Sequence, residues 1–277
     1  MSDTPAITVI YLWRFGNPPH FARRFLESLI RYPAGLDYKL LYLLKGFPED
    51  KKDEEFEALR DQLPCHAETL AVSDDLYITS AHLAGAESEF CDTEFVFPLT
   101  SWTEVLASNW LLHFANAYKN TPNCGIVGAT GSFESIGDTT PFPNVCIRTT
   151  AFFMKREDFI RAERGPLETK YDNNLMEAGP NSLSKQMLDH GRALVVVDKF
   201  GTVHAPSAWP ESLTYRAGHQ ENLLITDNRP HHYDKENNRR RKRLARHAWG
   251  SQINVPWNPP WRRLWVHLRY KYDLFVR

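Results

Sequence analysis

The sequence lacks several features that would assign it to a class at once. Its four cysteines, Cys65, Cys91, Cys124 and Cys146, are scattered, with no C-x-x-C pair. This scatter argues against a disulfide framework or a zinc site and favours buried free thiols. No apolar run reaches the roughly 20 residues that a membrane-spanning helix needs. The first residues also lack the basic and then apolar pattern of a secretory signal, so we expect a cytoplasmic protein.

Acidic residues are nearly absent from the last part of the chain. From Arg239 to Arg277 there are 11 Lys or Arg residues and one acid, Asp273. The preceding residues therefore carry 22 bases and 33 acids, although the formal net charge of the whole chain is only −1. This division indicates that the basic segment contacts something anionic: a membrane surface, nucleic acid or the acidic body of the protein itself.

Short apolar segments alternate with amphipathic ones over the first hundred residues. Strands are predicted at 7–12, 40–44, 70–72 and 94–99, and helices over 21–30, 48–62 and 78–89. Strands that alternate with helices in this way predict a parallel sheet covered on both faces. The composition, 42% apolar and 24% charged, is that of an ordinary globular enzyme.

The second half of the chain is less regular. Helices are predicted over 102–118, 156–163 and 181–190, and strands over 125–128, 148–155 and 193–198. Beyond Tyr233 the composition becomes basic, rich in tryptophan and interrupted by proline. We therefore predict an α/β domain over residues 1–234 and a basic, helical, Trp-rich extension over 235–277.

Three short segments carry a family resemblance. They read PNVCIRTTAF at 143–152, EAGPNSL at 177–183 and QENLLITDN at 220–228. Over roughly residues 7–230 the order of these parts resembles the GT-A glycosyltransferases, and is similar to family-2-like bacterial enzymes of polysaccharide gene clusters. The resemblance implies a Rossmann-like, mostly parallel sheet flanked by helices. It also implies transfer of a sugar from a nucleotide-sugar to an acceptor hydroxyl, of a surface polysaccharide or a glycolipid.

The resemblance places the donor at the tips of two strands. Asp75 would accept hydrogen bonds from the nucleotide, or would only cap the following helix. At the tip of the fourth strand the family usually holds a divalent ion with Asp-x-Asp, where this chain has Thr100 and Ser101. Hydroxyls bind sugar or phosphate but hold a hard cation weakly, so we expect no metal site of that kind. Arg148 is then a candidate to offset the diphosphate charge. Alternatively, Ser101 begins a helix in a capping box with Glu104.

Glu177 is the candidate general base. An inverting transfer needs a carboxylate that takes the proton of the acceptor hydroxyl as its oxygen attacks the anomeric carbon. The family places this group at the N-terminus of a helix, and Glu177 lies four residues before Asn181, where a helix is expected to begin. The alternative is that Glu177 serves only the helix dipole or a surface ion pair.

Two further residues are candidates for contact with the acceptor. Ser132 ends a loop of small residues that lets a ligand approach the backbone closely, although a tight turn explains such a loop equally well. Trp209 can stack on the apolar face of a sugar ring or simply pack in the core. His204 follows the last predicted strand, and we expect an ordinary hydrogen-bonded histidine there rather than a metal ligand.

The extension and the function both leave alternatives. Trp249, Trp257, Trp261 and Trp265 lie among arginines, a composition typical of a peripheral anchor on the inner face of an anionic membrane. Packing on the acidic body is the equal alternative, and nucleic-acid binding the less favoured one. Besides glycosyl transfer, the fold allows a nucleotidyltransferase or a catalytically degenerate binding module.

Overall fold

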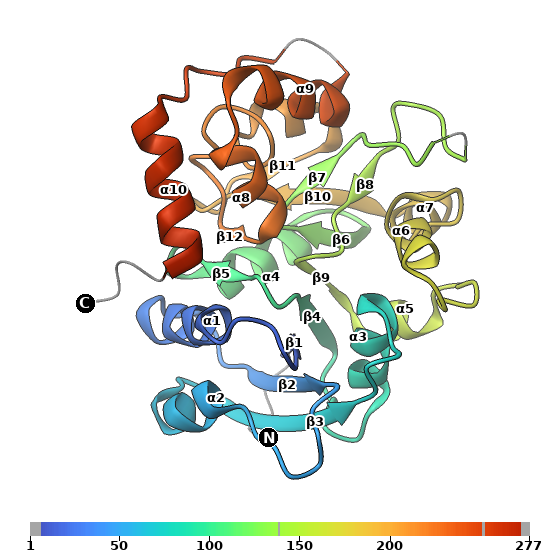
Figure 1. Cartoon of the computed structure of the whole chain (residues 1–277). Helices are drawn as coiled ribbons and strands as arrows, with labels where there is room; N and C mark the ends of the chain where they lie inside the picture. Colours follow the sequence, from blue (N-terminus) through green and yellow to red (C-terminus); the bar gives the residue numbers. More distant parts are fainter. Residues whose placement is uncertain (1–6, 138, 251–252, 273–277) are drawn as a thin grey trace.

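A mixed eight-stranded sheet runs through the molecule (Figure 1). The computed structural model describes residues 7–137, 139–250 and 253–272. Across the sheet the strands lie in the order β11 (Val203–His204), β10 (Ala193–Val197), β6 (Cys124–Gly128), β9 (Phe152–Lys155), β4 (Phe95–Leu99), β1 (Ile7–Arg14), β2 (Lys39–Lys45) and β3 (His66–Val72). β9 is antiparallel to both of its neighbours and β11 to β10, whereas the other pairings are parallel. The predicted mixed, mostly parallel α/β sheet is confirmed.

Helices cover both faces of the parallel half of the sheet. Successive side chains of β1 point to opposite faces. Val9 and Tyr11 therefore pack in one core cluster with α1 (His20–Arg31), and Ile10 packs in the other with α3 (Ile78–Glu87). β1 is buried up to its last residue, as expected of a strand covered on both sides.

The other elements connect or flank this sheet. In chain order they are α2 (Glu54–Leu59), η1 (Arg60–Gln62), β5 (Glu104–Val105), α4 (Trp110–Asn120), β7 (Gly131–Ser132), β8 (Cys146–Ile147), α5 (Arg156–Arg161), α6 (Lys170–Ala178), α7 (Leu183–Asp189), η2 (Pro206–Glu211), β12 (Ile225–Thr226), α8 (Asn228–Lys235), α9 (Asn238–Trp249) and α10 (Pro260–Tyr272). β5 pairs with β12 and β7 with β8 outside the main sheet. All of the strands and helices predicted in the first hundred residues are present.

The helix predicted over 102–118 begins only at Trp110. The residue before it, Asn109, has a φ of 59°, which interrupts any helix that would continue from the preceding segment. Val105 instead pairs with Ile225 in the small β5–β12 ladder. Ser101 therefore begins no helix, and the capping box considered for it is wrong.

α6 was not predicted, although its start signal stands in the sequence. The Thr169 side chain accepts a hydrogen bond from the backbone of Asp172, and the Asp172 carboxylate accepts one from the backbone of Thr169. This reciprocal capping box satisfies N–H groups that have no partner within the helix. The helix ends at Ala178, and at the next residue, Gly179, a Cβ would lie 2.5 Å from the carbonyl oxygen of Leu175.

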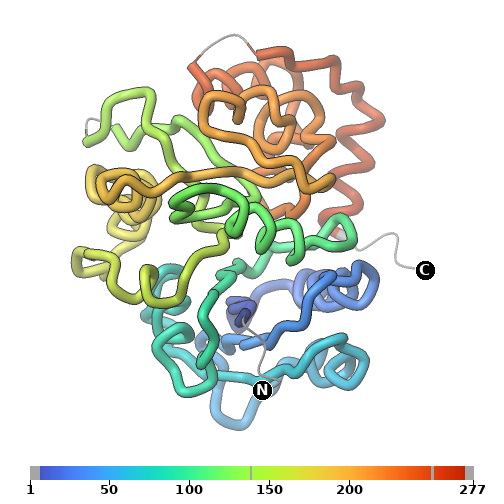
Figure 2. Tube along the Cα trace, turned by 180° about the vertical axis from the view of Figure 1, so that it is seen from behind, coloured from blue at the N-terminus to red at the C-terminus, as the bar shows by residue number. Residues whose placement is uncertain are grey.

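The described part of the basic extension packs on the body. Arg241 is fully buried and donates hydrogen bonds to the carbonyl oxygens of Gly218 and Pro256. Trp249 donates its indole N–H to the carbonyl of Tyr215. Figure 2 shows α10 beside α1, and the Arg24 guanidinium bonds the carbonyl of Arg269 there. Packing on the body is thus observed for the described residues, while the boundary at residue 234 remains a prediction from composition.

Candidate functional site

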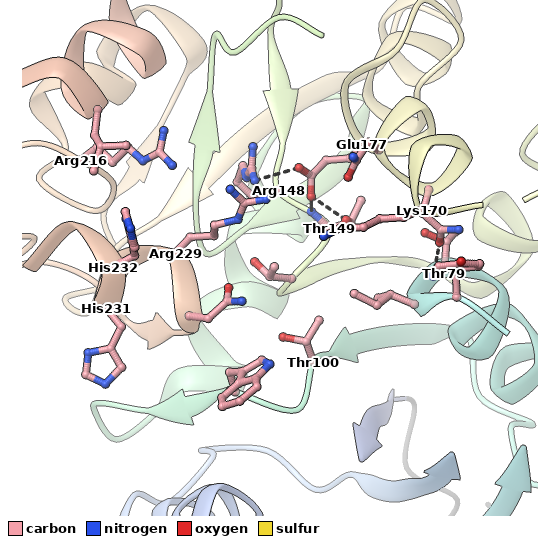
Figure 3. A pocket seen from close by; sticks show the side chains of 18 of the residues that line it. Thr79, Thr100, Arg148, Thr149, Lys170, Glu177, Arg216, Arg229, His231 and His232 are labelled. Atoms are coloured by element: carbon pink, nitrogen blue, oxygen red, sulfur yellow. Dashed lines mark hydrogen bonds and ion pairs between the residues drawn. The ribbon is translucent and has the colours of Figure 1, made fainter. Parts of the chain in front are cut away.

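A cavity of about 640 Å³ opens near the carboxyl end of β4 (Figure 3). Thr100 follows β4, and Thr79 lies in the first turn of α3. Arg148, Thr149 and Thr150 come from the segment between β8 and β9, and α6, α8 and α10 complete the wall. Ligands of open α/β sheets bind at this edge, because loops from several strands converge there.

The cavity is strongly cationic. Five Lys or Arg side chains line it, from Arg148, Lys170, Arg216, Arg229 and Lys235, and in the described part of the chain Glu177 is the one carboxylate that does so. The side chains of Lys170, Arg229 and Lys235 have no ion-pair partner among the residues described. Cations without such partners create a positive potential that attracts anions.

Two histidines of α8 add polar groups to the wall rather than charge. Burial, reinforced by Arg24, Arg269 and Lys235, lowers the pKa of His231 to about 3. Burial also lowers the pKa of His232 below its usual value. Both imidazoles are therefore neutral near pH 7 and can each donate and accept one hydrogen bond.

Glu177 lies in the last turn of α6, so its prediction at a helix N-terminus is wrong. A carboxylate near a helix C-terminus faces the negative end of the helix dipole. Its neighbours offset this, because Arg148 Nη2 lies 2.9 Å from Oε1 and Thr149 donates both its N–H and its hydroxyl to Oε2, at 3.0 and 2.7 Å. The structure does bring Glu177 to the cavity wall.

Arg148 belongs to a buried network of charges behind the cavity. Its Nη1 lies 2.5 Å from Glu134 Oε2, and Arg216 and His247 both contact Glu134 Oε1. Burial by itself would raise the pKa of Glu134, but Arg148, His247 and Arg216 hold it below the usual range. Since Arg148 already pairs with Glu134 and Glu177, most of its charge is neutralised within the protein.

Of the two hydroxyls at the tip of β4, only that of Thr100 lines the cavity. The Ser101 hydroxyl donates to the carbonyl of Leu12 at 2.7 Å and is buried, so it holds β1 and the tip together. Within the described residues no group of three or more His, Cys, Asp or Glu side chains is placed to bind a metal ion.

Asp74 and Asp75 have different surroundings at the end of β3. Asp74 is paired with Arg14 and Lys45, the last residues of β1 and β2, which hold its pKa well below the usual range. Asp75 is exposed, and its carboxylate accepts a hydrogen bond from Ser73 at 3.3 Å. It does not cap α3, which begins after Tyr77, and it stands outside the cavity wall, which starts at Tyr77.

The two acceptor candidates lie in the core. Trp209 is 1% exposed and donates its indole N–H to the carbonyl of His204. Its ring packs on Gly131, where a Cβ would come within 2.6 Å. Ser132 is fully buried, with its hydroxyl near Cys146. Neither side chain is open to an acceptor, and we assign both to packing.

His204 is hydrogen-bonded, as expected for an ordinary histidine. Its Nε2 lies 3.0 Å from Oδ2 of Asp198. Asp198 also accepts backbone N–H bonds from Phe200 and Thr202, so it organises the turn between β10 and β11.

A second cavity, of about 520 Å³, continues from the first. The two share Arg148, Glu177 and Arg229 in their walls, and the second extends to Arg243 and His247 on α9. Arg243 is exposed and has no ion-pair partner in the described part of the chain. Glu177 therefore stands where two connected spaces meet, both lined by cations.

Sequence reasoning missed the cations that now define the site. Lys170 follows Thr169 of the capping box, which could have located α6. Arg229 and Lys235 lie six residues apart on α8, which begins with Asp227 as its N-cap. The sequence does not show that α6 and α8 face the same space, because about fifty residues separate them.

No family model matches the chain, and no curated protein matches it. Among solved structures it is similar to mouse xyloside xylosyltransferase 1 (TM-score 0.42, 15% identity, 69% of this chain and 85% of that one). It is also similar to a Pyrobaculum calidifontis mannosyltransferase complexed with GDP-Man and Mn²⁺ (TM-score 0.44, 14% identity, 69% of this chain and 54% of that one). A third similar structure is an active-site mutant of LgtC (TM-score 0.42, 11% identity, 56% of this chain and 60% of that one). Likenesses this distant say nothing of substrate or mechanism.

Proposed function

We propose that the chain is a GT-A-like glycosyltransferase that moves a sugar from a nucleotide-sugar to an acceptor hydroxyl. The observation that carries this proposal is the cavity at the carboxyl edge of the sheet. Among the described residues its wall holds three cations without ion-pair partners and a single carboxylate. Transfer from a nucleotide-sugar needs cations to bind the negative diphosphate, and it needs a carboxylate to take the proton that the acceptor hydroxyl loses. The resemblance in the sequence points to the same chemistry.

The diphosphate is assigned to Lys170, Arg229 and Lys235. Their charges are available to a ligand, whereas that of Arg148 is already shared by two carboxylates. Positive groups at this place stabilise the charge that develops on the leaving diphosphate, which is the role that a metal ion has in many such enzymes. Thr100 lies in the same wall and can hydrogen-bond the sugar or a phosphate. Asp75 remains the proposed contact of the nucleotide.

Glu177 is the proposed base of an inverting transfer. A carboxylate has about four lone-pair sites. Thr149 uses two on Oε2 and Arg148 one on Oε1, which leaves one site on Oε1 for the acceptor. As the acceptor oxygen bonds to the anomeric carbon, its proton passes to Glu177. The bond from that carbon to the phosphate oxygen breaks, and the nucleoside diphosphate leaves with the electron pair.

The second cavity is the proposed entrance for the acceptor. It reaches Glu177 from the side of α9 and shares Arg229 with the cavity assigned to the donor. Arg243, which is exposed and lines this cavity, can pair with a glycan or a lipid-linked sugar that carries negative charge. A surface polysaccharide or a glycolipid under assembly is such an acceptor.

A non-catalytic binding module is the second candidate. The observation that favours it is the internal use of Glu177, whose carboxylate holds Thr149 and Arg148 in place. A module of this kind would bind the nucleotide-sugar and release no nucleoside diphosphate. Assays for release of UDP or GDP from UDP-sugars and GDP-sugars separate the two candidates.

Nucleoside diphosphates should raise the thermal unfolding midpoint, because a ligand of the native state stabilises it. At a concentration of about 100 times the Kd the gain is about 2.7 kcal/mol. We expect UDP or GDP to give this rise, and the rise to persist in EDTA because protein cations bind the phosphates. A rise that needs Mn²⁺ would contradict metal independence, and no rise with any nucleoside diphosphate would contradict the donor site.

Removal of single cations should weaken binding of the diphosphate group. In Arg229→Ala and Lys235→Ala we expect the Kd of the nucleoside diphosphate to rise roughly ten- to hundredfold, since a charge-assisted hydrogen bond is worth about 1.5–3 kcal/mol. Calorimetry measures this, with Lys119→Ala on α4 as the matched control and the bare nucleoside as the matched ligand. Equal weakening of nucleoside and diphosphate would show that the cations do not contact phosphate.

A further inference from the structure

α10 has an inner and an outer face. Val266 and Tyr270, four residues apart, line the first cavity. Trp261 and Leu264 point the other way and are 72% and 58% exposed. This is the geometry of a helix in which positions three and four residues apart share a face. The same short helix therefore forms a wall of the proposed active site and part of the outer surface.

The outer face is unusually apolar. On the helix it consists of Trp261, Leu264 and Trp265, and the side chain of Trp265 is 46% exposed. Trp257, three residues before the helix, is 69% exposed and is counted with them. Single apolar side chains are common on protein surfaces, but a group of large ones on one helix marks a contact surface. We call these four residues the outer α10 face.

Exposed cations lie on α10 and on the helix before it. Lys271 is near the end of α10, and Arg239, Lys242 and Arg246 are on α9; both helices lie in the half of the molecule away from β1, β2 and β3 in Figures 1 and 2. None of the four has an ion-pair partner among the residues that the structure describes. Indoles favour the headgroup level of a bilayer, and Lys and Arg are attracted to anionic lipid.

We propose that the outer α10 face docks on an anionic bilayer surface. The helix would lie in the plane of the interface, with its indoles among the headgroups and the cations of α9 on anionic lipid. A symmetric contact between two copies through the same face fits less well, because it would bring like cations together. In the described residues no helix is long and apolar enough to cross a bilayer.

Docking has a consequence that rests on the proposed function. Because Val266 and Tyr270 form the inner face of α10, a docked molecule would hold one cavity wall at the membrane surface. Docking would therefore hold the cavity assigned to the donor, which meets the acceptor entrance at Glu177, close to the membrane surface. The docking itself does not depend on glycosyl transfer and is tested separately.

Vesicle sedimentation tests the proposal with the full chain. We expect binding to vesicles of phosphatidylcholine with phosphatidylglycerol, little binding to phosphatidylcholine alone, and release by salt. The double variant Trp261→Ser/Leu264→Ser should bind at least about tenfold more weakly, since two large apolar side chains are lost. Phe200→Ser is the matched control, because Phe200 is 68% exposed on the turn after β10.

Each outcome decides the proposal. Unchanged binding by the double variant, or no binding by the unaltered chain, overturns it. So does light scattering that shows a dimer in the unaltered chain and a monomer in the double variant, which would make a second copy the occupant. An unchanged midpoint shift with nucleoside diphosphate shows that the double variant is folded and that the donor site is independent of docking.

Discussion

Replacement of Glu177 by glutamine should lower kcat for release of nucleoside diphosphate by about 10²–10⁴-fold, the usual contribution of a positioned base. Glutamine has nearly the same shape, and its amide oxygen can still accept hydrogen bonds from Thr149. It cannot take a proton from the acceptor or from water. Binding of the nucleoside diphosphate should persist, because the cations assigned to the phosphates are Lys170, Arg229 and Lys235.

The control for this substitution is Glu168→Gln. Glu168 is exposed in the segment before α6 and has no ion-pair partner in the described part of the chain. A purely structural role of Glu177 would lower the unfolding midpoint of Glu177→Gln and leave kcat per folded molecule unchanged. That result would end its assignment as the base even if the chain proves to be a transferase.

Replacement of Glu134 by glutamine should destabilise the fold by about 3–5 kcal/mol, the usual cost of removing one partner of a buried ion pair. Glu134, Arg148 and Arg216 are all buried, and Glu134 contacts both guanidinium groups. When Glu134 loses its charge, Arg216 has no carboxylate partner left among the described residues, and Arg148 keeps only Glu177 as a partner. Denaturant unfolding measures the change.

The matched control is Glu157→Gln, which breaks an exposed ion pair with Arg161 on α5. Pairs of that kind contribute less than about 1 kcal/mol, so the control should unfold almost like the unaltered chain. Equal and small losses in the two variants would show that the buried network adds little to the stability of the fold.

The effect of Glu134→Gln should also depend on pH. Burial alone would raise the pKa of Glu134, but Arg148, His247 and Arg216 hold it below the usual range. A carboxyl group with a lowered folded-state pKa stabilises the fold fully above its unfolded pKa, about 4.3. That stabilisation is lost as the pH falls through the lower pKa of the folded state. The stability gap between the two proteins should therefore narrow in acid and be widest near neutral pH.

The elements of the first half could be predicted because their signals are local. β1 and β2 have the apolar pattern of buried strands, and α1 has that of an amphipathic helix. Each pattern is read from the residues of the segment itself and does not depend on which element packs beside it. The second half was harder to predict. The segment from 102 to 109 has an apolar content that suits a helix. Instead, part of it pairs with β12, whose residues are more than one hundred positions further along the chain, and a local pattern does not show such a partner.

The candidate site could be predicted only in part. Glu177, Thr100 and Arg148 were chosen from short motifs, and all three line the cavity. Trp209 and Ser132 were chosen by residue type, and both are buried because burial depends on what packs over a side chain. The partners of Arg148 were also hidden, since Glu134 lies 14 residues before it and Glu177 lies 29 after it.

By itself, the sequence determined the α/β class, the alternation of strands and helices, and the concentration of positive charge in the last forty residues, because periodicity and composition are read along the chain. Only the tertiary structure decided where the charges act. It brought Lys170 and Glu177 from α6 into one cavity wall with Arg229 and Lys235 from α8, and it turned one face of α10 inward and the other outward. The physical reason is that an electrostatic site depends on distance in space and on burial, and neither is a local property of the chain.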